Sequence, residues 1–175
     1  MSATTTEVPA GTYTLEPVHS SFGFAVKHNG VSKFRGQFED VTATLENGVL
    51  TGRAQVDSVK TPIPTLKDHL VGPDFFHAAE TPTIEFRSND IRISADGTVE
   101  LDGVLTIRGV TQPVKATGTI AAGTSMSGEE VLGLELEATI DRRDFGINWQ
   151  APLPSGALAV AWEVTIEAQL ELTKG

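Results

Sequence analysis

The sequence predicts an all-β protein, an antiparallel sandwich or barrel with one short helix near residues 65–71. Three observations lead to this prediction. Apolar and polar residues alternate along the stretch 157–172, Asn-Gly and Asp-Gly dipeptides separate pairs of alternating segments, and a single segment breaks the period of two. Alternation places successive side chains on opposite faces of a strand, and many such strands joined by short turns are typical of antiparallel folds.

The longest alternating stretch is Ala157–Leu172. Its apolar positions are Leu158, Val160, Trp162, Val164, Ile166, Ala168, Leu170 and Leu172. At about 3.3 Å per residue, a single strand of this length would run about 45–50 Å, so the sheet that contains it would be tall. Closing a tall sheet into a barrel removes its exposed edges, which favours a barrel.

The rest of the chain divides into shorter alternating segments. From the N-terminus, strands are expected at residues 13–15, 21–27, 31–38, 41–45, 50–56, 91–93, 99–107, 114–120 and 132–140. Asn47-Gly48 is the strongest hairpin signal, because both residues accept the positive φ angles of a type I′ turn. Asp96-Gly97 is expected to repeat this device, and Thr111-Gln112-Pro113 is expected to turn the chain before residue 114.

One segment lacks strand alternation. The stretch from Pro62 to Thr65 precedes Leu66-Lys-Asp-His-Leu70, and Gly72-Pro73 follows. Thr65 can cap a helix N-terminus, and Gly-Pro ends a helix. We therefore expect one short helix across the mouth of the barrel.

Length and composition limit the classes of partner. The chain has 175 residues and a formal net charge of −10, and it lacks the Lys/Arg clusters that nucleic acids and anionic membranes attract. It contains no cysteine and no apolar run of transmembrane length. Residues 1–10 resemble a flexible tail without the features of a secretory signal, so the prediction is a cytoplasmic protein with one domain over residues 11–175.

Glycines interrupt the apolar side of several predicted strands. Gly36, Gly52, Gly103 and Gly118 are all in phase with apolar neighbours. Barrels need glycine kinks to bend a sheet, which is one explanation. The other is space for a guest, because an eight-stranded barrel is either filled by side chains or holds one small ligand. A tall, apolar interior would suit a linear hydrocarbon chain.

Several stretches resemble the YceI-like family, also called polyisoprenoid-binding proteins. Each stretch is weak alone, but their order over residues 12–172 is specific. They are Tyr13-Thr-Leu-Glu-Pro-Val-His-Ser20 with Phe22-Gly-Phe24, Asp68-His-Leu70 with Asp74-Phe-Phe76, Pro82-Thr-Ile-Glu-Phe-Arg-Ser88, Leu101-Asp-Gly-Val-Leu-Thr-Ile-Arg-Gly-Val-Thr-Gln-Pro-Val114 and Asp141-Arg-Arg-Asp-Phe-Gly-Ile147.

The resemblance implies an elongated, lipocalin-like antiparallel barrel of about eight strands with an apolar pore. It also implies that the pore binds an isoprenoid-type lipid, a polyprenyl lipid or an isoprenoid quinone, for transport, storage or sequestration. Inward positions are the candidate ligand-binding residues: Phe22, Phe24, Phe34, Phe38, Leu101, Gly103, Leu105, Ile107, Gly118, Leu134, Leu136, Trp162 and Val164.

Three polar residues are candidate contacts for a lipid head group. His19 could instead be a structural histidine bonded to a loop carboxylate, and Arg142 and Asp144 could instead form a solvated corner. The four histidines show no zinc-binding spacing, so no metal and no other cofactor is expected.

The alternatives to lipid binding are a non-catalytic stress-response or interaction module that uses the barrel as a scaffold, and a small hydrolase or metalloenzyme. Catalytic motifs such as a phosphate loop or a Gly-x-Ser-x-Gly elbow are absent, so an enzyme is not expected. The sequence is compatible with a homodimer and does not set the oligomeric state.

Overall fold

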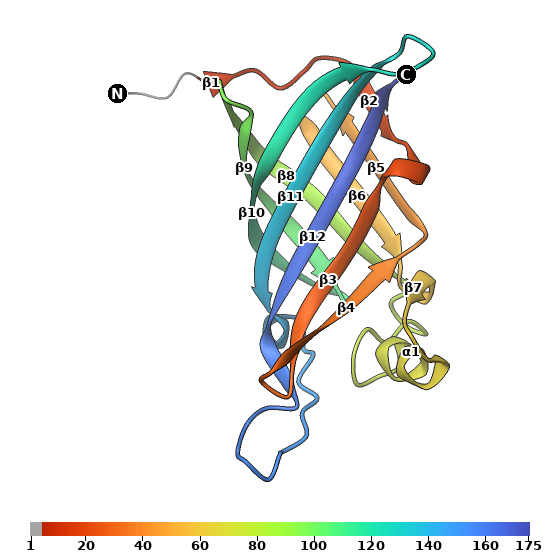
Figure 1. Ribbon diagram of the computed structural model, residues 1–175, viewed down its shortest axis with the longest axis vertical. Coiled ribbons are helices and arrows are strands. Elements are labelled where there is room, and N and C mark those ends of the chain that lie inside the picture. The colour runs from red at the N-terminus through yellow and green to blue at the C-terminus, as the bar shows by residue number, and fades with distance from the viewer. Residues whose placement is uncertain (1–4) are drawn as a thin grey trace.

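The computed structural model of the protein describes residues 5–175 and forms a tall, closed antiparallel barrel (Figure 1). Its strands are β1 (Thr5–Thr6), β2 (Thr12–Leu15), β3 (Ser21–His28), β4 (Ser32–Phe38), β5 (Val41–Glu46), β6 (Val49–Gln55), β7 (Val59–Lys60), β8 (Thr83–Ser94), β9 (Thr98–Ile107), β10 (Val110–Thr124), β11 (Glu130–Asp141) and β12 (Val160–Lys174). The helices are α1 (Pro64–Val71) and the 3₁₀ turns η1 (Pro17–His19), η2 (Val56–Ser58) and η3 (Arg142–Phe145).

Eight strands close the ring in the order β12–β2–β5–β6–β8–β9–β10–β11, and β11 pairs back onto β12. β12 is long enough to have two partners on its other side, because β2 pairs with it near Leu172 and β3 pairs with it from Gln169 to Val160. The predicted all-β barrel is therefore confirmed. The lower part of the wall continues from β3 through β4 to β7.

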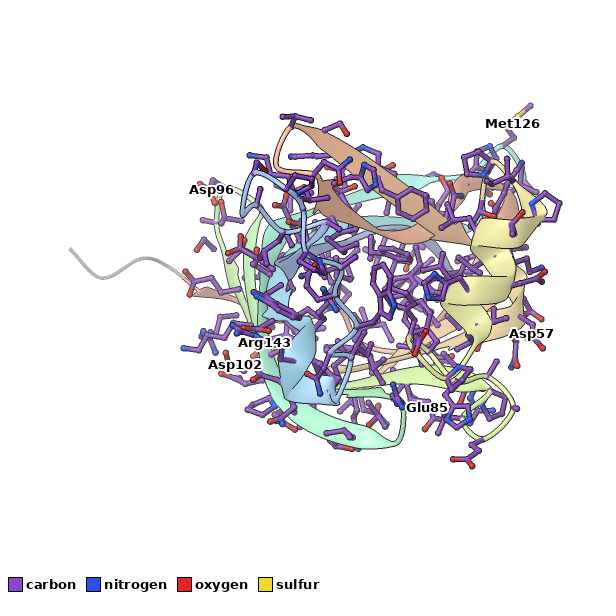
Figure 2. All side chains as sticks on the ribbon, turned by 90° about the horizontal axis from the view of Figure 1, so that it is seen from below. Asp57, Glu85, Asp96, Asp102, Met126 and Arg143 are labelled. Atoms are coloured by element: carbon purple, nitrogen blue, oxygen red, sulfur yellow. The ribbon has the colours of Figure 1, made fainter. Side chains whose placement is uncertain are left out.

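The two ends of the barrel differ. The end drawn at the top of Figure 1 carries β1, the tight turns after β5 and β8, and the C-terminus. The lower end carries α1, η3 and the long segment 146–159 (Figure 1). Seen from below, α1 runs along one side of this lower end rather than across it (Figure 2). We call the lower end the mouth.

Most predicted elements are present, with shifted boundaries. Asn47 and Gly48 have φ angles of 52° and 78°, which confirms the hairpin turn between β5 and β6. Asp96 is not in a positive-φ conformation whereas Gly97 is, at 88°, so the β8–β9 loop differs from the turn expected there.

Two local predictions were wrong. The turn before β10 is formed by Arg108 and Gly109, at φ 54° and 76°, and Thr111–Pro113 lies inside β10. Thr65 does not cap α1: Ile63 is the N-cap and makes no side-chain cap bond, while Pro64 occupies the first turn, a position where its missing N–H costs nothing.

The N-terminal segment is partly structured. Thr5–Thr6 pair with Ser94 and Ile93 of β8, although they belong to the segment predicted as a tail. Residues 1–4 of that predicted tail lie outside the described residues. Within residues 5–175, no helix is long and apolar enough to cross a bilayer.

Candidate ligand-binding site

A cavity of about 460 Å³ occupies the lower half of the barrel and opens at the mouth. It lies between the inner face of the barrel, the β3–β4 hairpin, α1 and the segment 146–159. Its lining residues are Phe22, Gly23, Phe24, Val26, Lys27, His28, Ser32, Lys33, Phe34, Phe38, Leu66, His69, Leu70, Phe75, Phe76, Ile84, Ile107, Ile140, Arg142, Ile147, Trp149, Val160, Val164 and Ile166. A largely apolar concavity of this size is typical of small-molecule sites.

Phenylalanines form one wall of this cavity. Alternation along β3 and β4 points Phe22, Phe24, Phe34 and Phe38 inward, and their registers stack the rings across the hairpin. The ring centroids of Phe24 and Phe38 are 5.9 Å apart, and Phe76 approaches both at 5.9 and 5.7 Å. Aromatic pairs at such separations hold one another in place. The wall is therefore a preformed apolar surface.

A second aromatic group stands at the mouth and joins α1 to the segment 146–159. The His69 ring contacts Phe75 and Trp149 edge-on, with centroids 4.8 and 4.9 Å apart. His69 Nε2 also lies 3.1 Å from a carboxylate oxygen of Asp74. Because these residues come from separate segments, movement of either segment would widen or narrow the opening.

Arg142 lies at the base of the cavity and is only 3% exposed. Its guanidinium donates hydrogen bonds to the carbonyl oxygens of Ala161 and Ile147 at 2.9 Å and of Val160 at 3.1 Å. Burial lowers its pKa, which the nearby Asp141 carboxylate partly offsets. These bonds tie η3 to both ends of the segment 146–159, so Arg142 fixes the mouth.

Above the cavity the interior narrows and then becomes solid. A smaller cavity of about 90 Å³ continues upward and shares Phe22, Ile84 and Ile166 with the lower one. Small side chains contribute to its lining, namely Ala43, Ala54, Ala116, Ala138 and Ala168. Higher still, the side chains pack into one cluster with no more than about a tenth of each exposed: Tyr13, Ala43, Leu45, Leu50, Ile93, Val99, Leu101, Ala116, Leu132, Leu134, Leu170 and Leu172. The barrel is thus hollow below and filled above.

The in-phase glycines serve two different purposes. A Cβ on Gly103 would lie 2.6 Å from the Arg87 carbonyl oxygen and 2.7 Å from the Phe86 ring, and one on Gly118 would collide with the backbone of Glu135. These two glycines permit close packing and leave no room for a guest. Gly52 differs, because its nearest neighbour would be the Thr42 carbonyl oxygen at 3.7 Å and it lines the smaller cavity.

The candidate residues from the sequence fall into three groups. Residues that line the lower cavity are Phe22, Phe24, Phe34, Phe38, Ile107 and Val164, and those that line the smaller one are Phe22, Leu105 and Leu136. Leu101 and Leu134 belong to the filled upper half, and Gly103 and Gly118 line neither cavity. Ligand contact by the lining residues stays a prediction.

Trp162 does not line the cavity. The registers of β12 and β3 set four residue steps, from Val160 to Val164, against two steps on β3, so the strand bulges at Trp162. Its ring lies against two guanidinium groups instead, with the Cζ atoms of Arg142 and Arg143 at 4.4 and 4.8 Å from the ring centroid. The apolar phase read from the sequence fails at this bulge.

The three predicted head-group contacts lie in different places. His19 is in η1, which connects β2 to β3, and it lines neither cavity; its Nδ1 atom is 2.8 Å from the Glu16 carboxylate. Arg142 does line the cavity, although backbone oxygens already take part of its donors. The exposed Asp144 does not line it.

Glu16, His19 and Glu171 form the one group of potential metal ligands found among the described residues. Glu16 already caps η1 by accepting backbone N–H groups of Val18 and His19 at 3.2 and 2.7 Å. Partial burial raises the pKa of Glu16, but these hydrogen bonds and the His19 ring outweigh it and lower the pKa overall. Capping accounts for this geometry without an ion.

Sequence reasoning missed much of the mouth. Lys27, Lys33, His69, Phe76 and Trp149 line the cavity but were not among the candidate residues. Those on α1 and the two following segments lack strand alternation, so no phase could assign them to an inner face. Their only signal was the motif Asp68-His-Leu70 with Asp74-Phe-Phe76.

Comparison with known proteins gives a family match. The model of the YceI-like domain matches residues 13–172. The UPF0312 protein SAB2563 of Staphylococcus aureus is 30% identical over 172 residues, which cover 92% of this chain and 96% of that protein.

Solved structures share the fold. BcnA of Burkholderia cenocepacia superposes with a TM-score of 0.73 at 21% identity, covering 90% of this chain and 98% of that one. A polyisoprenoid binding domain from Saccharophagus degradans, implicated in plant cell wall breakdown, superposes with a TM-score of 0.70 at 12% identity, covering 93% and 98%. At these identities the likeness concerns the fold.

Proposed function

The chain belongs to the YceI-like family, and from that membership we propose that it binds an isoprenoid-type lipid in the lower cavity and transports, stores or sequesters it. The observation that carries the proposal is the apolar cavity of about 460 Å³ with its phenylalanine wall. The printed description of the Saccharophagus degradans domain as polyisoprenoid binding supports the same class of ligand.

The energetics favour a hydrocarbon guest. Each buried CH₂ group contributes about 0.8 kcal/mol before the cost of ordering the chain. An apolar guest would also cover the inward faces of Phe22, Phe24 and Phe34, which stay only half-buried without one. The scaffold alternative predicted no apolar tunnel, so the cavity favours lipid binding over that alternative.

Native mass spectrometry of the protein purified from its own source, followed by organic extraction, tests the proposal. A stoichiometric isoprenoid-type lipid is the expected result. Val164 lines the cavity and Thr165 is the next residue along β12, on the opposite face of the strand. Val164→Trp should therefore abolish lipid binding while Thr165→Trp preserves it.

A clean mass without lipid, together with no binding of added polyprenol or quinone, would refute the proposal. Equal lipid content in both tryptophan variants would refute the location in the lower cavity. Catalysis plays no part in the proposed role. A cytoplasmic location stays a prediction from the sequence, which cell fractionation with an antibody to the protein tests.

A further inference from the structure

The enclosed space limits the length of the guest. The lower cavity measures about 460 Å³ and the smaller one above it about 90 Å³, and the filled upper half stops both. At about 30 Å³ for each water-sized group, the two spaces together hold about 18 non-hydrogen atoms. That is room for about three isoprene units, and a chain twice as long would extend out of the mouth.

The charge around the cavity has one sign. The lining contains the cationic side chains Lys27, Lys33 and Arg142, together with two histidines, and no Asp or Glu of residues 5–175 contributes to it. The chain as a whole has a net charge of −10, so an all-basic lining runs against its composition. The acidic side chains labelled in Figure 2, Asp57, Glu85, Asp96 and Asp102, point away from the barrel axis.

Lys27 and Lys33 are the two cations that a guest could reach directly. They are direct cross-strand partners in the β3–β4 hairpin, and both are exposed. Like charges placed opposite each other destabilise a strand pair. Within the described part of the chain, neither ammonium group has a carboxylate within 4.0 Å, whereas Arg35 on the same strand pairs with Glu167 at 3.1 Å. An anion at the mouth would relieve this repulsion.

We propose that the ligand is a single-chain amphiphile of about 15–18 carbons whose anionic end group, a carboxylate or a phosphate, is bound by Lys27 and Lys33 at the mouth. The inference rests on the proposed function, because it assigns the chain to the lower cavity. It goes further by fixing the length of the enclosed chain and the charge of the end group. The chain runs upward past Phe22 toward the alanine-lined space, and the end group stays at the mouth.

Isothermal titration with three probes of the same fifteen-carbon chain tests the end group. The probes are farnesol, farnesoic acid and farnesyl monophosphate. The two anions should bind at least about tenfold more tightly than the alcohol, consistent with charge-assisted contacts. In the double variant Lys27→Gln/Lys33→Gln this preference should fall below about threefold, while farnesol binds as before.

The matched control is Lys115→Gln/Lys174→Gln, which removes the same charge from residues that line neither cavity and should keep the preference. Equal binding of alcohol and anions by the wild type, or an anion preference that survives in the lysine variant, would overturn the inference and leave the proposed function standing. Failure of all three probes to bind would overturn both. The stronger of the two anions identifies the end group.

A series of straight-chain acids from ten to twenty-two carbons tests the length. Affinity should rise about fourfold per CH₂ group and level off at about 16–18 carbons, when the cavity is full. Ala168→Phe, in the smaller cavity, should move the plateau to shorter chains. A rise that continues to twenty-two carbons would overturn the length limit.

Discussion

The ring of Phe24 occupies the space in front of Gly36, with its Cζ atom 2.5 Å from where a Cβ on residue 36 would lie. The two residues are direct partners across the β3–β4 hairpin. An absent side chain on β4 is therefore what allows an aromatic ring on β3 to lie flat against the wall. The cavity owes its shape to this pair.

Gly36→Ala should destabilise the protein by about 2 kcal/mol, because the added methyl group displaces the Phe24 ring. Gly52→Ala is the matched control, since its Cβ would have no neighbour closer than 3.7 Å, and it should change stability by less than about 0.5 kcal/mol. Urea denaturation of both variants measures the difference. Equal effects would contradict the packing argument.

Arg142→Met should cost about 3 kcal/mol, because it leaves buried carbonyl oxygens without donors. Arg143→Met is the comparison: both guanidinium groups lie against Trp162, but Arg143 bonds the partly exposed Asp141. An exposed ion pair contributes less than about 1 kcal/mol, so this variant should be nearly as stable as the wild type. Chemical denaturation separates the two, and limited proteolysis should find the segment 146–159 more susceptible only in Arg142→Met.

Leu101→Ala should lower stability by about 2–5 kcal/mol and leave lipid affinity unchanged, because Leu101 is 1% exposed within the filled upper half. Leu136→Ala should cost less, since Leu136 is half-buried and lines the smaller cavity. It should also shift the preferred chain length upward. Thermal unfolding and probe titration at a temperature where both variants are folded check this. A binding defect in Leu101→Ala would place the guest higher than we infer.

Asp141→Asn should make stability less dependent on acid. Hydrogen bonds from the Arg143 side chain lower the pKa of Asp141, with partial burial acting in the opposite direction. A carboxyl group with a lowered folded-state pKa stabilises the fold above its unfolded value and loses that contribution as the pH falls through the folded value. The variant should therefore be less stable by under about 1 kcal/mol at pH 7 and equal to the wild type near pH 2. A constant difference from pH 7 to 2 would contradict this.

The sequence predicted the barrel because period-two alternation reports directly which face of a strand is dry. The β5–β6 hairpin followed from the turn chemistry of Asn47-Gly48. The β9–β10 turn was missed because Arg108 adopts a positive φ that its residue type seldom takes, and the chosen Thr-Gln-Pro segment lies within the strand. Turn signals identify favourable residues, not every turn.

The site was harder to predict than the fold. Alternation assigned Phe24 and Leu101 equally to the interior, but it carries no information on which layers are filled, and one lines the cavity while the other is in solid core. Trp162 was misplaced because nothing in its neighbourhood signals the bulge. The opposed lysines depend on the register of β3 with β4, which only the three-dimensional pairing provides.

The seam of the barrel has a consequence for synthesis. β12 pairs with β2 and β3 from the start of the chain, so that Lys174 lies opposite Tyr13. On the ribosome, β2, β3 and β11 therefore wait with open edges until nearly the whole chain has emerged. Such long-range pairing is slow, and exposed edges can pair with other chains. The nascent protein should depend on chaperone protection far more than the finished, edgeless barrel does.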